Sequence, residues 1–166
     1  MAWSERKVRQ LFADDPIRLQ QALGKKDYEA EARQLLALAL AEMEGPVDEI
    51  GTWIRAAKRL GVKNVHKLAR GEGPGYYVWQ DRTIYYNPHT DAITAIVEFA
   101  HEWGHDLLAY RRTASMRYGI QRFDGYRYAA QQQICVYFQE MARTIVLAEV
   151  ARKALSSQKD ISGSAP

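Results

Sequence analysis

Residues 97–110 read VEFAHEWGHDLLAY, and this stretch carries the strongest pattern in the chain. His101 and His105 stand four residues apart, and Glu102 directly follows the first histidine. Residues i and i+4 of an α-helix differ in direction by about 40°, so both imidazoles would point to one side. Apolar residues recur around them at spacings of three and four, which predicts an amphipathic, firmly packed helix. These apolar positions are Ile93, Ile96, Val97, Ala100, Trp103, Leu107 and Leu108.

The pattern H-E-x-x-H suits a metal site. Imidazole nitrogens bind zinc well, and a catalytic zinc needs three protein ligands and one open position for water. Glu102 could take a proton from that water and later pass it to a leaving amine. The alternative is that His101, Glu102 and His105 are ordinary residues of a helix surface and bind no metal. The metal site is favoured because two of the four histidines of the chain stand inside the pattern.

Gly104 lies in the middle of the predicted helix. Glycine lowers helix propensity by about 1 kcal/mol relative to alanine. We therefore expect another segment to pack closely against this position.

Turn-forming and helix-capping residues predict the elements around this helix. Two β-rich runs, YYVWQ (76–80) and TIYYN (83–87), flank a polar turn at Asp81 and Arg82, which predicts a β-hairpin. Thr90 or Asp91 can cap a helix that continues to about residue 110. The run AAQQQICVYFQEMARTIVLAEVARKAL (129–155) predicts a long closing helix.

The first 70 residues have a helical pattern, with amphipathic segments at 5–13, 15–24, 27–45 and 47–61. Residues 47–71 are more typical of ordinary packed helices than of a helix-turn-helix. The predicted fold is α+β and mostly helical, with a hairpin before the histidine helix and a long closing helix. We expect a helical region at 1–70 packed on a core at 71–157, followed by a flexible polar tail at 158–166.

Composition narrows the class of protein. The chain has 166 residues, of which 47% are hydrophobic and 26% charged, as in one globular domain. A net charge of +3 permits an acidic partner without requiring nucleic acid. No apolar run approaches the roughly 20 residues of a membrane span, and no secretory signal is evident. The single cysteine, Cys135, excludes an internal disulfide and is predicted to be a core residue. We therefore expect a cytoplasmic protein.

A third metal ligand must be a carboxylate, because no histidine follows His105. Asp106 would point away from the shared side of the helix, and Asp124 lies in a turn-like segment, QRFDGYR. Glu140 and Glu149 lie on opposite faces of the closing helix, so only one can face the metal. Periodicity does not separate these two glutamates.

From RTIYYNP through AIVEFAHEWGHDLL, the chain resembles zincin metallopeptidases of the ImmA/IrrE type. In that family a strand of the form x-I-x-x-N precedes a helix with H-E-x-G-H, and a later helix supplies a glutamate. The segment QEMARTIVLA makes Glu140 the best match for that glutamate. The resemblance covers residues 76–148 and implies a zincin-like, gluzincin-type zinc peptidase that cleaves a protein partner. It implies zinc ligation by His101, His105 and Glu140, with Glu102 as general base.

Two further segments suggest partners. The strand TIYYN could hold a peptide by edge pairing through Ile84, Tyr85 and Tyr86. The basic, aromatic stretch 110–128 could bind nucleic acid, frame an acidic peptide, or be a solvated loop. A second function is therefore a catalytically weak, zinc-containing, zincin-like protein that binds nucleic acid or a regulatory partner. The intact Glu102 favours the enzyme.

Overall fold

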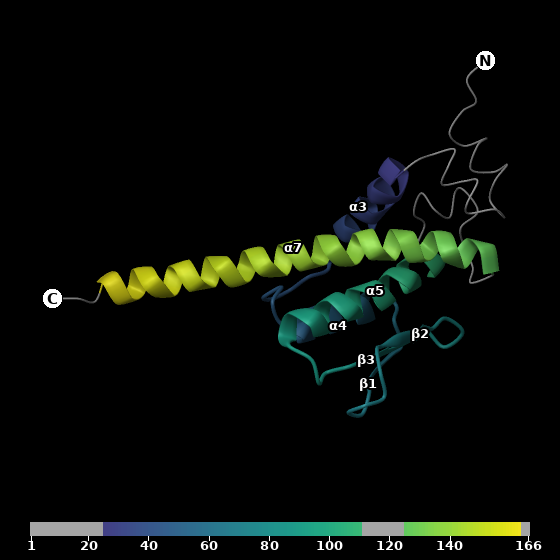
Figure 1. The fold of residues 1–166 in the computed structure, drawn as a ribbon, viewed down its shortest axis with the longest axis horizontal. Helices are drawn as coiled ribbons and strands as arrows, with labels where there is room; N and C mark the ends of the chain where they lie inside the picture. Colours follow the sequence, from purple (N-terminus) through teal and green to yellow (C-terminus); the bar gives the residue numbers. More distant parts are fainter. Residues whose placement is uncertain (1–24, 111–124, 164–166) are drawn as a thin grey trace, which may run out of the picture.

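The structure is a computed structural model that describes residues 25–110 and 125–163 (Figure 1). The segments 5–13 and 15–24, expected to be helical, lie outside these residues, as does most of the basic stretch 110–128. The described elements are α3 (Lys25–Ala41), α4 (Ile50–Arg59), β1 (Asn64–Lys67), β2 (Tyr76–Val78), β3 (Thr83–Tyr86), α5 (Ala92–Tyr110) and α7 (Gly125–Gly163).

Helix α5 lies at the centre of the arrangement. It packs along α7 on one side and against α4 and the small sheet on the other, while α3 lies against α7 (Figure 1). Large aromatic side chains fill the interior: Trp103 meets Trp53 of α4 edge to face at 6.2 Å and Phe138 of α7 at 6.4 Å. The coarse prediction of a mostly helical α+β fold is confirmed.

The expected hairpin is present, with β2 antiparallel to β3. A strand that the sequence did not reveal, β1, pairs in parallel with the other edge of β3, so that the sheet order is β1-β3-β2. Of its four residues only Val65 is even partly buried, so no hydrophobic alternation marks this strand. The segment weighed as a helix-turn-helix is therefore the helix α4 followed by a strand.

The position of β3 corrects the expected substrate strand. Both edges of β3 are hydrogen-bonded to neighbouring strands, so its backbone has no free edge for a peptide. Ile84 is fully buried, and Tyr86 packs edge to face on Phe99 of α5. Tyr85 stacks on Tyr76 with ring centroids 4.5 Å apart. Edge pairing by Ile84, Tyr85 and Tyr86 was therefore a wrong prediction, and these residues build the sheet and its packing.

Helix α5 begins where the capping pattern predicted. The Asp91 carboxylate accepts a hydrogen bond from the Thr94 backbone N–H at 2.9 Å and another from the Thr94 hydroxyl at 2.6 Å. An N-cap of this kind satisfies one of the orphan N–H groups of the first turn. The cap fixes the start of the helix, and with it the direction in which each later side chain points.

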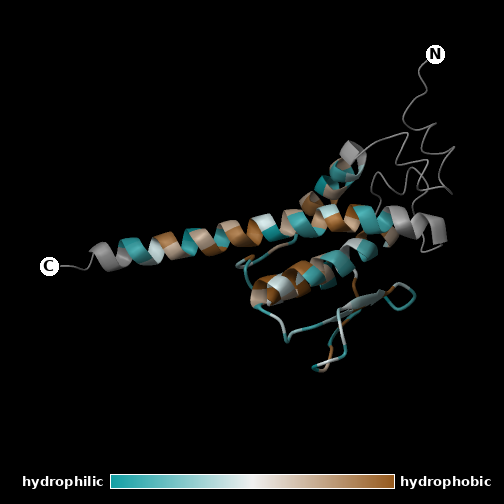
Figure 2. Ribbon diagram, in the orientation of Figure 1, coloured by the Kyte–Doolittle hydropathy of each residue, from teal (hydrophilic) through white to brown (hydrophobic). Residues whose placement is uncertain are grey.

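Helix α7 is longer than predicted. It begins at Gly125 rather than near residue 129 and continues through Gly163, across most of the segment expected to be a tail. Its C-terminal part extends beyond the other elements (Figure 1). Hydrophobic and hydrophilic residues are interspersed there (Figure 2), and Leu147, Val150 and Leu155 are exposed. The helix therefore continues beyond the residues that pack against the other elements, and the hydrophobic pattern of the sequence marks only those packed residues.

None of the helices in the described ranges combines the length and the continuous apolar surface needed to span a lipid bilayer.

Candidate functional site

His101 and His105 lie on the side of α5 that faces α7. Their rings are 5.1 Å apart between centroids, and His105 is buried whereas His101 is partly exposed. Burial, reinforced by the neighbouring His101, lowers the pKa of His105 to about 4. His105 is therefore a neutral imidazole at physiological pH, which is the form that binds metals.

The two histidines aim their Nε2 atoms at one point. His101 Nε2 lies 2.7 Å from Gln132 Oε1, and His105 Nε2 lies 3.0 Å from the same oxygen. The other ring nitrogen of His101, Nδ1, lies 2.6 Å from Gln139 Oε1. Both glutamines come from α7, so the two helices build this site together.

Glu102 is held in a poorly solvated position beside the histidine pair. Burial raises its pKa to about 8, and the negative charge of Glu98 one turn earlier adds to the effect. One carboxylate oxygen of Glu98 is itself buried without a hydrogen-bond partner among the described residues. A carboxylate kept from water is a stronger base than an exposed one. The two imidazoles therefore share α5 with two carboxyl groups that are partly buried.

The close approach of the two helices depends on Gly104, as predicted. A Cβ at this position would lie 3.0 Å from Cys135 Sγ and 3.2 Å from Phe138 Cδ1, both on α7. Such contacts are too tight for a side chain to be accommodated without a shift. Cys135 is fully buried, and burial raises the pKa of its thiol, as befits the predicted core residue rather than a nucleophile.

The structure does not bring Glu140 to the histidine pair. Its side chain is 53% exposed and forms an ion pair with Arg143 at 3.1 Å. Gln132, Cys135, Phe138 and Gln139 turn toward α5, and Glu140 is rotated about 100° from Gln139. The expected third ligand is therefore on the wrong face of α7 in this arrangement.

The other candidates for the third ligand among the described residues also lie elsewhere. Glu149 forms an ion pair with Arg152, and Asp124 lies outside the described residues. Asp106 is fully buried and accepts hydrogen bonds from Arg82 Nε at 3.0 Å, from Arg82 Nη2 at 2.8 Å and from the Tyr77 hydroxyl. Across residues 25–110 and 125–163, no three His, Cys, Asp or Glu side chains gather as a metal site.

Sequence reasoning missed Gln132 and Gln139. They are seven residues apart and so lie on one face of a helix, next to the buried residues Cys135 and Ala142. Two amides in register with an apolar stripe are a usable signal. Glutamine is an uncommon metal ligand, so this signal does not by itself indicate a metal site.

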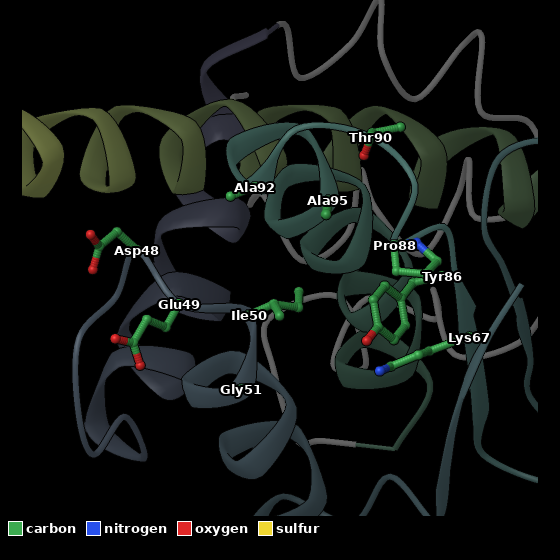
Figure 3. A pocket seen from close by; sticks show the side chains of 10 residues that line it. All are labelled: Asp48, Glu49, Ile50, Gly51, Lys67, Tyr86, Pro88, Thr90, Ala92 and Ala95. Atoms are coloured by element: carbon green, nitrogen blue, oxygen red, sulfur yellow. The ribbon is translucent and has the colours of Figure 1, made fainter. Parts of the chain in front are cut away.

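A separate hollow of about 480 Å³ lies where the N-terminal ends of α4 and α5 approach the end of β3. Figure 3 shows Tyr86 and Lys67 on one side of the hollow, with Glu49 on the opposite side and Ile50 between them. Ala92 and Ala95 contribute from α5. The hollow contains neither histidine, so it is not the site formed by His101 and His105.

Comparison with models of known protein families, with curated proteins and with solved structures gave no match.

Proposed function

We propose that this chain is a zinc-dependent metallopeptidase with a zincin-like core, which hydrolyses peptide bonds of a protein partner. One observation carries the proposal: two imidazole Nε2 atoms converge on one point, and Glu102, directly after His101 on the same helix, holds a partly buried carboxyl group. We further propose a cytoplasmic location, because the single cysteine is typical of proteins from a reducing compartment.

The histidines suit a zinc ion on the chemistry of their donors. When Nδ1–H of His101 donates to Gln139 Oε1, the lone pair of His101 is left on Nε2, where it can bind a metal. His105 is neutral and offers the same atom. His101 and His105 would therefore hold the metal through Nε2. Zinc bound there would supply Lewis-acid activation of water and of a peptide carbonyl.

Glu102 is the proposed general base. It would take a proton from the attacking water and donate it to the leaving amine, which is the exchange that a carboxyl group with a raised pKa performs well near neutral pH. Its proximity to the histidines follows from the sequence, since it adjoins His101 on α5. Glu98, one turn earlier, keeps this part of the site negative.

A second function, that of a catalytically weak zincin-like binding protein, is favoured by a different observation. The amide that faces the histidines is uncharged, and Glu140 is ion-paired on the outer face of α7. Such a protein would act through a regulatory partner or nucleic acid, the latter by the basic stretch 110–128.

The variant Glu102→Gln separates the two functions. We expect zinc-loaded protein to cleave members of a random peptide library, and mass spectrometry of the products measures the rate. The Glu102→Gln variant should cleave about 10²–10⁴-fold more slowly while keeping its zinc. Glu72→Gln, at an exposed glutamate, is the matched control and should cleave like the unchanged protein. Equal cleavage by the Glu102→Gln variant, or none by the unchanged protein, would contradict the peptidase proposal.

A further inference from the structure

We propose that Gln132 is the third protein ligand, so that the metal centre consists of two imidazoles and one neutral amide. This inference rests on the proposed zinc binding at the histidine pair. It assigns a ligand from α7 that is neither a histidine nor a carboxylate, and it replaces Glu140 in that role.

The first argument is the convergence of three electron-pair donors. Gln132 Oε1 lies 2.7 Å from His101 Nε2 and 3.0 Å from His105 Nε2. An amide oxygen only accepts hydrogen bonds, and a neutral imidazole has one N–H to give. His101 faces a glutamine oxygen from each ring nitrogen, because Nδ1 meets Gln139 Oε1 at 2.6 Å. A neutral His101 cannot donate a hydrogen bond to both oxygens. A cation beside Nε2, in contrast, is attracted by the lone pairs of His101 Nε2, His105 Nε2 and Gln132 Oε1.

The second argument is that the amide is held in place by packing rather than by chance. Cys135 and Phe138 press against Gly104 one turn or less from His101 and His105, and this contact fixes the distance between α5 and α7. Gln132 and Gln139 lie on the same face of α7 as these two residues. The contact between α5 and α7 at Gly104 therefore positions Gln132 as well as the two histidines.

The charge of such a site has a measurable consequence. Two neutral imidazoles and an amide leave the full +2 charge of zinc uncompensated by its ligands, whereas a carboxylate would offset one unit. Replacing the amide by a carboxylate of the same length, Gln132→Glu, should therefore tighten zinc binding.

The opposite orientation of the amide gives a rival explanation. With its –NH₂ group toward the histidines, Gln132 would donate to both Nε2 atoms and occupy the metal position as a plug. A plug and a ligand predict opposite effects of Gln132→Ala: removing a plug strengthens zinc binding, and removing a ligand weakens it.

The experiment is a zinc titration of the full chain in competition with a chromogenic chelator. We expect Gln132→Ala to weaken zinc affinity about 10–100-fold and Gln132→Glu to strengthen it. Gln133→Ala, at the exposed neighbouring glutamine, is the matched control and should bind as the unchanged protein does. Cobalt substitution provides a second readout, since loss of a ligand changes the visible absorption spectrum.

Unchanged or tighter zinc binding by Gln132→Ala would overturn the assignment of Gln132. The variant His101→Ala separates that result from failure of the proposed function. If His101→Ala abolishes zinc binding and Gln132→Ala does not weaken it, only the third ligand is wrong. If the unchanged protein binds no zinc, both the assignment and the peptidase proposal fail. A fold control is provided by circular dichroism of each variant.

Discussion

Helix α5 carries a row of three carboxyl groups at four-residue spacing, and the surroundings of these groups differ along the row. At the C-terminal end of the row, Asp106 is fully buried and satisfied by two hydrogen bonds from Arg82 and one from Tyr77. In the two preceding turns, Glu98 has a buried oxygen without a partner in the described part of the chain, and burial raises the pKa of Glu102 to about 8. Satisfied buried groups hold a fold together, whereas incompletely satisfied ones cost stability and mark sites kept for chemistry.

The Asp106 cluster joins elements that are distant in the sequence. Arg82 lies in the hairpin turn and also donates from Nη2 to the Leu60 carbonyl oxygen at the end of α4, at 3.1 Å. Its guanidinium lies 4.2 Å from the centroid of the Tyr110 ring. The cluster therefore ties α4, the hairpin and α5 at one place. It is a structural device at the C-terminal end of the carboxyl row, one turn beyond Glu102.

The largest expected effect comes from making the same change at both ends of this row. Asp106→Asn should reduce the free energy of unfolding by about 3–5 kcal/mol, because it leaves the Arg82 charge without its partner in a mostly buried position. Glu98→Gln, also a carboxylate-to-amide change on α5, should alter stability by no more than about 1 kcal/mol. Urea denaturation of both variants, without metal, measures the difference. Equal losses of stability would remove the distinction between the two ends of the row.

The second prediction sharpens the comparison at the contact between α5 and α7. Gly104→Ala should reduce stability by about 1–3 kcal/mol despite the better helix propensity of alanine, because the added Cβ would lie 3.0 Å from Cys135 Sγ. Adding Cys135→Ala removes that sulfur and should recover part of the loss.

A thermodynamic double-mutant cycle on Gly104 and Cys135 checks this contact. We expect a coupling of about 0.5–3 kcal/mol, as found for residues in direct contact. Additive losses would mean that α7 does not press on Gly104. The close packing that positions Gln132 would then lack its basis.

Local signals predicted much of the fold. The capping carboxylate of Asp91, the turn at Asp81 and Arg82, and the spacing of apolar residues in α5 each depend on neighbouring residues, and each was readable from the sequence. The strand β1 was not, because its four residues are mostly exposed and its stability comes from pairing with β3, about twenty residues further along the chain. Central placement of β3 was missed for the same reason.

The candidate site likewise has one part that follows from local sequence and one part that depends on packing between distant segments. His101, Glu102 and His105 share one helix, so their mutual positions follow from helical geometry alone. The residue opposite them depends on the rotation of α7 about its axis, which is set by the contact of Cys135 and Phe138 with Gly104. An error of one residue turns the helix by about 100°, which is enough to exchange the inward Gln139 for the outward Glu140.

The smallest expected effect tests this rotation of α7 directly. Glu140→Ala should change stability by about 0–1 kcal/mol, because its ion pair with Arg143 is exposed on both sides. Zinc affinity should not change, because Glu140 faces away from the histidines. If Glu140 were the third zinc ligand, as the sequence pattern predicts, its removal should instead lower zinc affinity about 10-fold or more. Chelator competition on Glu140→Ala, alongside Arg143→Ala as a matched change at the same ion pair, decides between them. A loss specific to Glu140→Ala would mean that α7 turns when metal binds, and the outer face of that helix would then belong to the metal centre.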